Sequence, residues 1–246
     1  MDSRNSVEVV PPLKGHGIVV TSAAFSPDSN RIVTGSYDGT ARIWSAQPRA
    51  GMMNRNEGHS SYVRCVAFSL DCTKIVSASH DGPAMIWDTQ TGKRVNLPLK
   101  NDAGSISCVS FSPEGKEVIA VVGSGVVRHW DVSSGVQTTQ RLVGPGRGIA
   151  SLFASDEGRK IITVQDRHEI RVWDVSTGES LSPPFYGHEN LITDAATSEE
   201  CGRLITTSYD KTARLWDTRT GIGWVLPLTE HRETTYNCAE FSPDGK

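Results

Sequence analysis

The tryptophans of this sequence recur at a fixed interval. Each follows the previous one by 43 residues over four successive intervals, and only Trp224 lies outside the series Trp44, Trp87, Trp130, Trp173 and Trp216. Self-similarity with a period of about 20–50 residues is typical of repeat architectures, in which one supersecondary unit is stacked many times. The chain is therefore expected to be a tandem array.

Further landmarks keep the same period. Gly-His pairs fall on it at Gly15-His16, Gly58-His59 and Gly187-His188. Six-residue runs rich in β-branched residues predict short buried strands at Arg31–Ser36, Lys74–Ser79, Glu117–Val122, Lys160–Gln165 and Arg203–Ser208. Turn sequences stand beside these runs at Phe25–Ser29, Phe111–Gly115, Phe241–Gly245 and Tyr37–Gly39. The pattern predicts four short strands in each repeat.

A repeat of about 40–45 residues that carries Gly-His and Trp-Asp is typical of a propeller blade. Kelch blades are longer and typically carry a Gly-Gly pair, which this sequence lacks. The chain resembles the WD-repeat β-propeller family over nearly its whole length. The resemblance implies an all-β propeller in which each repeat supplies the outer strand of one blade and the three inner strands of the next.

The resemblance also implies a hydrogen-bonded tetrad in each blade, from a loop His through a Ser and an Asp to the Trp indole. Three repeats match this pattern, with His16, Ser36, Asp38 and Trp44; His59, Ser79, Asp81 and Trp87; and His188, Ser208, Asp210 and Trp216. The third and fourth repeats depart from it, with Asp102 and Pro145 at the His position and Ser124 and Arg167 at the Asp position. Because a buried network rigidifies only when it is fully satisfied, the middle repeats are expected to be softer.

The repeats set the expected domain organisation. Residues 1–246 are expected to form one propeller domain, with repeats at about 14–57, 58–100, 101–143, 144–186 and 187–229 and a partial sixth at 230–246. Five full blades and a partial sixth predict an incomplete or open propeller. Three interpretations stay open: a fragment of a longer protein, completion by a second copy or another chain, and a tightened autonomous ring.

Composition narrows the partners and the location. The 25 Lys and Arg side chains are balanced by 28 Asp and Glu, which argues against a mainly electrostatic hold on nucleic acid or an anionic membrane. Apolar stretches are too short to span a membrane, and no secretory signal is recognised. Five Cys without a C-x-x-C pair fit neither a disulfide framework nor a zinc site. We expect reduced thiols and a cytoplasmic protein, with the nucleus also open.

Three groups of residues invite a chemical role. The His, Ser and Asp of the tetrads resemble a hydrolase triad, but their recurrence in register with Trp favours architecture. Residues Gly144–Gly148 resemble a phosphate-binding turn but lack the Lys-Ser/Thr that follows in such motifs. Cys65, Cys108 and Cys238 occupy one repeat position and are interpreted as small apolar fillers on separate strands. We therefore expect no enzyme, no catalytic residue, no cofactor and no metal ligand.

Surface positions then carry the function. The residue before each turn Asp and the loop before each first strand are expected to gather on one rim, where the candidate partner-binding residues are Val19, Tyr37, Tyr62, His80, Leu191 and Tyr209. The alternative is that each Tyr only covers the neighbouring blade. The function expected is a scaffold that binds protein or peptide. Alternatives are the sensor propeller of a larger signalling protein, for example one attached to an NTPase module, and a lectin-like small-ligand binder.

Overall fold

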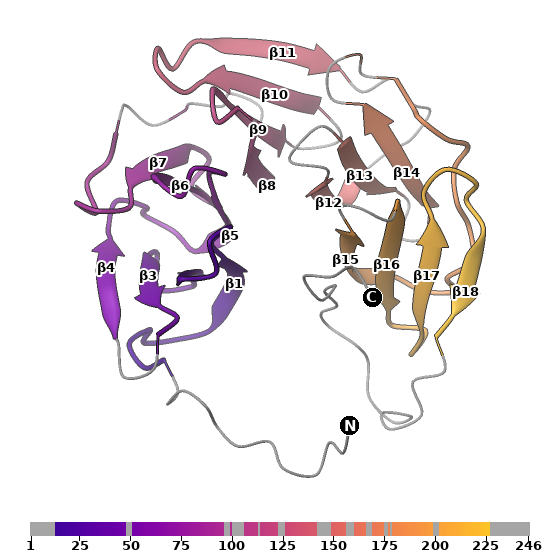
Figure 1. Cartoon of the computed structure of the whole chain (residues 1–246), viewed down its shortest axis with the longest axis horizontal. Coiled ribbons are helices and arrows are strands. Elements are labelled where there is room, and N and C mark those ends of the chain that lie inside the picture. The colour runs from indigo at the N-terminus through magenta and orange to yellow at the C-terminus, as the bar shows by residue number, and fades with distance from the viewer. Residues whose placement is uncertain are drawn as a thin grey trace. The chain divides into compact units, whose positions relative to one another are not determined.

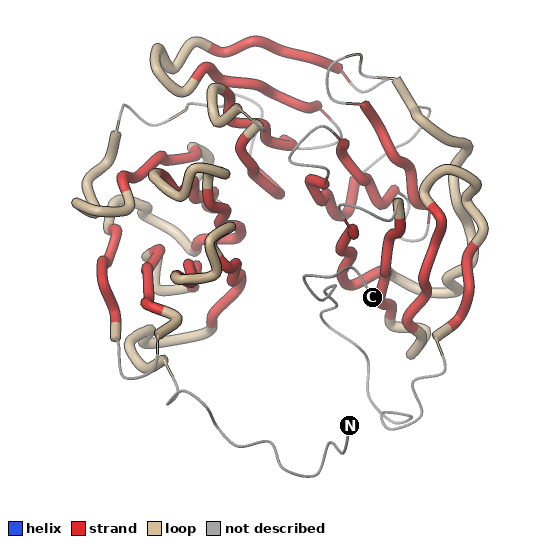
Figure 2. The backbone as a smooth tube through the Cα atoms, viewed as in Figure 1, coloured by secondary structure: helices blue, strands red, loops and turns tan. Residues whose placement is uncertain are grey.

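The computed structural model describes residues 13–47, 51–95, 99, 106–112, 114–122, 126–141, 149–155, 160–165, 169–174, 177, 179–198 and 202–226. Every regular element in these ranges is a β-strand (Figure 2). No helix that is long and apolar enough to cross a membrane occurs in them. The all-β prediction is confirmed.

The strands form five antiparallel sheets (Figure 1). The first has the order β1-β2-β3-β4 and consists of Val20–Phe25, Arg31–Ser36, Ala41–Ser45 and Met52–Asn56. The second has the order β5-β6-β7 and consists of Val63–Phe68, Lys74–Ser79 and Ala84–Asp88. The third has the order β11-β10-β9-β8, and its strands in chain order from β8 are Ile106–Phe111, Glu117–Val122, Val126–Asp131 and Gln137–Arg141.

The last two sheets repeat the pattern. The fourth has the order β12-β13-β14 and consists of Ile149–Ser155, Lys160–Gln165 and Glu169–Asp174. The fifth has the order β15-β16-β17-β18 and consists of Ile192–Ser198, Arg203–Ser208, Ala213–Asp217 and Gly223–Val225. Sequential strands pair as meanders within each sheet, which is the arrangement of a propeller blade.

The chain divides into two compact units. The amino-terminal unit spans Met1–Val118 with Val132–Gly135, and the carboxy-terminal unit spans Ile119–Asp131 with Val136–Lys246. The first two blades lie in the amino-terminal unit and the last two in the carboxy-terminal unit, while the third sheet has strands in both. Each unit is described below by itself.

The five predicted strands are the second strands of the five blades. β2, β6, β9, β13 and β16 have the bounds read from the sequence. Their apolar side chains lie in the core, as Val33, Ile75, Val118, Ile162 and Leu204 do. Because a strand inside a blade is covered on both faces, a short continuous apolar run is the pattern it needs.

Tryptophans that recur every 43 residues have equivalent pairing partners on the second strands of their blades. Trp44 pairs with Ile32, Trp87 with Ile75, Trp173 with Ile161 and Trp216 with Leu204, each joining the third strand of a blade to the start of the second. The turns between first and second strands are also repeated, since Ser29, Cys72 and Gly115 have positive φ angles of 56°, 60° and 65° at equivalent positions. The predicted turns at Phe25–Ser29 and Phe111–Gly115 are therefore present, the second blade has an equivalent turn at Cys72, and Phe241–Gly245 lies outside the described residues.

The outer strand is the variable part of the blade. Three sheets have the four strands that the sequence predicts. In the second blade, within the described residues, the outer edge consists of the isolated bridges Ala84↔Leu99 and Trp87↔Arg94. In the fourth it consists of Ile170↔Phe185 and Trp173↔Ser180. Backbone hydrogen bonds hold these two edges, such as those from the Leu99 N–H to the Ala84 carbonyl and from the Phe185 N–H to the Ile170 carbonyl, both at 2.8 Å.

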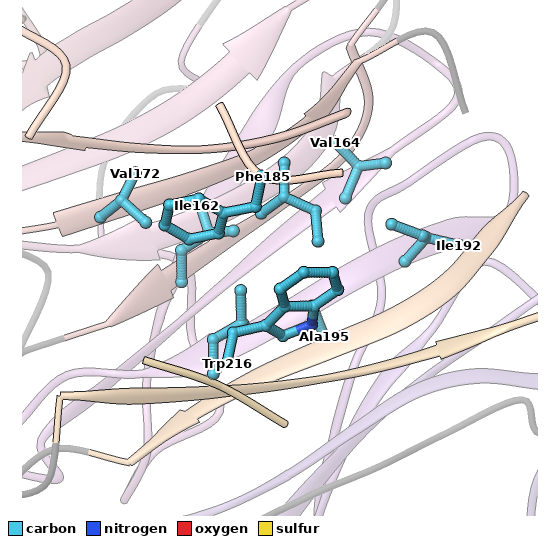
Figure 3. Close-up of a cluster of buried hydrophobic side chains, with 9 residues drawn as sticks. Ile162, Val164, Val172, Phe185, Ile192, Ala195 and Trp216 are labelled. Carbon is cyan, nitrogen blue, oxygen red and sulfur yellow. The ribbon is translucent and has the colours of Figure 1, made fainter. Parts of the chain in front are cut away.

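Adjacent blades of one unit share a hydrophobic core. In the amino-terminal unit, buried side chains of the first two blades form one cluster: Val33, Ala41, Ile43, Val63, Val66, Ile75, Met85 and Trp87, with Ala24 and Phe68 packed against it. In the carboxy-terminal unit, Phe185 lies with Trp216 and with Ile162, Val164, Val172, Ile192 and Ala195 (Figure 3). The stacked-repeat prediction is thus confirmed inside each unit.

Gly35 tests how tightly the first two blades are packed. A Cβ at this position would lie 2.6 Å from Val63 Cγ1 and 3.1 Å from Val66 Cγ1. Gly35→Ala is therefore expected to destabilise the protein by about 1–3 kcal/mol through overpacking. Gly51→Ala is the matched control, because a Cβ there meets nothing within 4 Å. Denaturant unfolding of the two variants measures the difference, and equal midpoints would contradict the packing.

Candidate functional site

A chain of hydrogen bonds crosses the first blade. His16 Nδ1 lies 2.8 Å from Asp38 Oδ2, and His16 Nε2 lies 2.7 Å from Thr34 Oγ1. The Trp44 indole N–H donates to the same Thr34 hydroxyl at 2.8 Å. A single proton arrangement satisfies all four groups: Nδ1–H donates to the carboxylate, the hydroxyl donates to Nε2, and its oxygen accepts from the indole.

The same chain recurs in the second and fifth blades. His59 Nδ1 lies 3.2 Å from both carboxylate oxygens of Asp81, and Ser77 Oγ lies 2.8 Å from both His59 Nε2 and the Trp87 indole nitrogen. In the fifth blade, His188 lies 2.7 Å from Asp210 and 2.7 Å from Thr206, whose hydroxyl accepts from Trp216 at 2.8 Å. His, Asp and Trp therefore meet where the sequence predicts.

The hydroxyl of the tetrad is not the predicted one. Ser36, Ser79 and Ser208 do not join His to Trp; Thr34, Ser77 and Thr206 do. Ser36 instead donates to the Val19 carbonyl at 2.8 Å and accepts the Asp38 backbone N–H at 3.1 Å. Because the Trp44 indole N–H reaches Thr34, Ser36 lies two residues, about 7 Å, further along the strand.

A periodic signal in the sequence marks the correct hydroxyl. The position of Thr34 holds Ser77, Thr163 and Thr206 in three other repeats, at multiples of 43 residues. Thr163 accepts the Trp173 indole N–H at 2.8 Å, so the fourth blade keeps half of the network. In the third repeat this position is Ala120, which has no hydroxyl to offer the buried Trp130. Asp102, Ser124, Pro145 and Arg167 lie outside the described residues.

The glycine before each tetrad histidine has a steric reason. A Cβ on Gly15 would lie 2.9 Å from the Trp44 ring, and one on Gly58 would lie 3.0 Å from the Trp87 ring. Gly187 and Trp216 have the same relation at 2.9 Å. The Gly-His pair thus lets the loop backbone reach the indole edge while the imidazole turns inward.

The environment of the tetrads favours a charged carboxylate and a neutral imidazole. Burial raises the pKa of the Asp38 and Asp210 carboxyls, but hydrogen bonds from neighbouring threonine side chains and the tetrad histidines hold each pKa below its usual value. Burial lowers the pKa of His59 and His188, and the facing carboxylates only partly oppose this. These two histidines are therefore neutral at pH 7, with both ring nitrogens engaged. This geometry fits an architectural role, because no ring nitrogen is left to act as a general base.

The six predicted binding residues form three backbone-linked pairs. The Tyr37 N–H donates to the Val19 carbonyl at 2.9 Å, His80 to Tyr62 at 3.1 Å, and Tyr209 to Leu191 at 2.9 Å. Each pair joins the loop before the first strand of a blade to the turn after its second strand. The two loop families are therefore brought together within a blade.

In the amino-terminal unit, two of these pairs merge into one surface. The Tyr37 and Tyr62 rings lie with centroids 5.0 Å apart, and Tyr62 stacks on His80 at 4.8 Å with an interplanar angle of 22°. Tyr37 is 51% exposed and Val19 59%. We call Val19, Tyr37, Tyr62 and His80 the aromatic rim. The exposed Ile18 and Val20 flank Val19 and are additions that the periodic positions did not single out.

The carboxy-terminal unit carries one equivalent pair. Tyr209 is exposed and Leu191 is half-buried. No group of three or more His, Cys, Asp or Glu side chains in the described ranges could hold a metal ion. The Gly-rich turn at 144–148 lies outside these ranges.

The Thr34 hydroxyl, which joins His16 to Trp44, is the group at which to test the tetrad. Thr34→Val keeps the shape of the side chain but leaves His16 Nε2 and the Trp44 indole N–H without their partner. We expect a loss of about 1–3 kcal/mol of unfolding free energy. Thr34→Ser should retain most of the stability, because Ser77 fills the same role in the second blade. Equal thermal midpoints for the two variants would contradict this assignment.

The tetrads also predict how stability depends on pH. The pKa values of His59 and His188 are lower in the folded chain than the 6.5 of a free imidazole, so the unfolded state binds more protons below that pH. Stability should fall as the pH drops from 7 through 6. A second loss should begin as the pH falls below about 4, where the unfolded counterparts of Asp38 and Asp210 become protonated. Thermal midpoints between pH 8 and pH 3 measure both, and a stability that rises on acidification from pH 7 would contradict the first.

Comparison with curated proteins finds short similarities. Over 43 residues, 18% of this chain, it is 49% identical to a ribosome biogenesis protein WDR12 homolog of Drosophila mojavensis and 46% identical to that of Drosophila persimilis. Over 52 residues, 20% of this chain, it is 40% identical to zinc finger CCCH domain-containing protein 17 of Oryza sativa subsp. japonica. The matched segments span only 10% and 12% of the lengths of these relatives, so the likeness is about one repeat long.

A family model gives the broader result. The model of the WD domain, G-beta repeat, matches residues 7–45, 53–88, 96–131 and 179–217, which together make up more than half of the chain. The unmatched stretch between the last two contains most of the fourth repeat, where the sequence lacks the tetrad His and Asp. The chain therefore belongs to the WD-repeat family, whose members generally act as protein-interaction scaffolds and not as enzymes.

Proposed function

We propose that this protein is a non-enzymatic scaffold that binds a protein or peptide segment on the aromatic rim. The observation that carries the proposal is the continuous row of ring contacts from Tyr37 through Tyr62 to His80, which extends across two blades. Aromatic side chains with a polar edge are enriched among the residues that dominate interface energies, because they bury a large area and have few rotatable bonds.

The backbone supports the rim independently of the side chains. Tyr37 and His80 are each held by an N–H donated to the facing loop, and the neighbouring Ser36 and Ser79 are buried with their hydroxyls bonded to backbone carbonyls. The backbone that carries the two rings is thus held in place by hydrogen bonds. A partner that binds there loses little free energy to ordering of the scaffold.

The apolar residues beside the rim and the charge balance of the chain indicate which kind of partner would bind. Ile18, Val19 and Val20 offer exposed apolar area beside Tyr37, which suits an apolar anchor residue. The carboxy-terminal quarter, residues 186–246, has 10 acidic and 6 basic side chains. A segment with an apolar anchor would complement the rim, and the acidic excess of the chain favours a partner with some basic residues, with charge acting mainly on specificity and association rate. Tyr209 and Leu191 would supply the corresponding contacts in the carboxy-terminal unit.

The test distinguishes a role of Tyr37 in partner binding from a role in packing between blades. Peptides selected on the wild-type chain from a random displayed library provide the ligands, and Tyr37→Ala is expected to weaken their affinity about tenfold or more. Its thermal midpoint should change little, because half of the Tyr37 side chain is already exposed. Met53→Ala is the matched control, since Met53 is equally exposed, at 51%, but lies on the outer strand β4.

Two results would contradict the proposal. If Tyr37→Ala and Met53→Ala reduced peptide affinity to the same extent, the rim would have no special role. If Tyr37→Ala lowered the thermal midpoint and left affinity unchanged, the tyrosine would be inter-blade packing against Tyr62.

A further inference from the structure

Two cysteines of the amino-terminal unit face each other between blades. Cys65 lies on β5 and Cys108 on β8, the first strands of consecutive blades. Their Sγ atoms are 3.4 Å apart, and both side chains are partly exposed. The interpretation of these residues as fillers on separate strands therefore misses their contact, which links two different sheets.

The repeat explains why they meet. Cys65 and Cys108 occupy one repeat position, and the residue at this position reaches across to the next first strand. Ser22, which holds the position in β1, accepts the Val66 backbone N–H at 3.3 Å, and Cys65 Sγ lies 3.6 Å from the Val109 carbonyl oxygen. The same position is Ser151 and Asp194 in the fourth and fifth repeats. Two thiols thus stand at consecutive positions only between the second and third blades.

The two thiols are chemically unequal. The hydrogen bond from Cys108 lowers the pKa of the Cys65 thiol, and the nearby Arg64 acts in the same direction. The same interaction raises the pKa of Cys108 well above its usual value. These shifts favour Cys65 as the sulfur that becomes a thiolate, and the 3.4 Å contact, in which either sulfur could be the donor, places Cys108 beside it. A nucleophilic thiolate with a second thiol in contact is the arrangement found in cysteines that sense oxidants.

We propose that Cys65 and Cys108 form a reversible redox modification site that a hydroperoxide converts to an inter-blade disulfide. The Cys65 thiolate attacks the terminal peroxide oxygen, the O–O bond breaks, and the sulfur becomes a sulfenic acid while an alcohol, or water from hydrogen peroxide, leaves with a proton. The Cys108 sulfur then attacks the sulfenic sulfur, the S–O bond breaks, and the hydroxyl leaves as water with the Cys108 proton. The two thiols are oxidised by two electrons and the peroxide is reduced.

Little movement is needed for this step. The Sγ atoms must approach by about 1.4 Å to reach the length of a disulfide bond. The product would covalently join first strands of two sheets at cysteines that are 43 residues apart in the chain. Because a cross-link restricts the unfolded chain more than the folded one, the oxidised protein should unfold at a higher temperature. None of the residues of the aromatic rim takes part in this reaction, so the outcome of the redox experiment is independent of peptide binding at the rim.

The experiment treats the full chain with hydrogen peroxide at a small molar excess. Peptide mapping without reductant should find a cross-linked Cys65–Cys108 peptide pair, lighter by two hydrogens than the separate peptides and released by dithiothreitol. A variant with Cys72→Ser, Cys201→Ser and Cys238→Ser should form the same cross-link. The oxidised form should show a thermal midpoint several degrees above that of the reduced form.

Single variants give the matched controls. Cys65→Ser copies the Ser22 of the first blade, so it should fold, form no cross-link, and leave Cys108 reduced. Cys108→Ser should stop the reaction at the Cys65 sulfenic acid, which dimedone labels. If peroxide left both thiols free, or oxidised Cys65 no faster than the buried Cys72, the proposal would be overturned.

Discussion

The hydrogen bond between the indole nitrogen and a hydroxyl on the second strand holds the first, second, fourth and fifth blades in register. A buried indole N–H without an acceptor costs free energy, so the hydroxyl determines how the third strand aligns with the second. The histidine then uses the same hydroxyl on its other side and brings the loop of the Gly-His pair onto the blade. Where the hydroxyl is kept and the histidine is absent from the sequence, as with Thr163 and Trp173, the strand pairing persists.

The strands and the tryptophan positions could be predicted because one physical requirement dominates each of them. A strand covered on both faces needs a short apolar run, which is why the bounds of β2, β6, β9, β13 and β16 follow from the sequence. The outer strands have one free edge and polar residues, so their pattern is weak. This explains why the outer edges of the second and fourth blades deviate from the four-strand prediction.

The choice of tetrad hydroxyl shows the limit of spacing arguments. In the first, second and fifth repeats, two hydroxyl residues stand two positions apart on the second strand, as Thr34 and Ser36 do. Both lie on the same face of the strand and both recur in these three repeats, so within them the period does not separate the two hydroxyls; only the fourth repeat does, where Thr163 is kept and Gln165 stands at the position of Ser36. Strand register decides between them, and register depends on pairing with the third strand. The contact of Cys65 with Cys108 was missed for a related reason, since the sequence does not give the distance between neighbouring sheets.

The turn after the second strand places opposite demands on adjacent residues. Ser36 and Asp38 both point into the blade, where each has hydrogen bonds to satisfy, while the Tyr37 side chain between them is half exposed, touches the Tyr62 ring and is held through its backbone N–H. The identity of the side chain at that middle position therefore contributes little to the stability of the fold. The position holds a tyrosine in the first and fifth blades, Tyr37 and Tyr209, and His80 in the second, while the three blades keep the same backbone hydrogen bond there. Such a position can change its recognition chemistry in a single mutational step without a compensating change in the core, so binding preference and fold stability can evolve along separate routes.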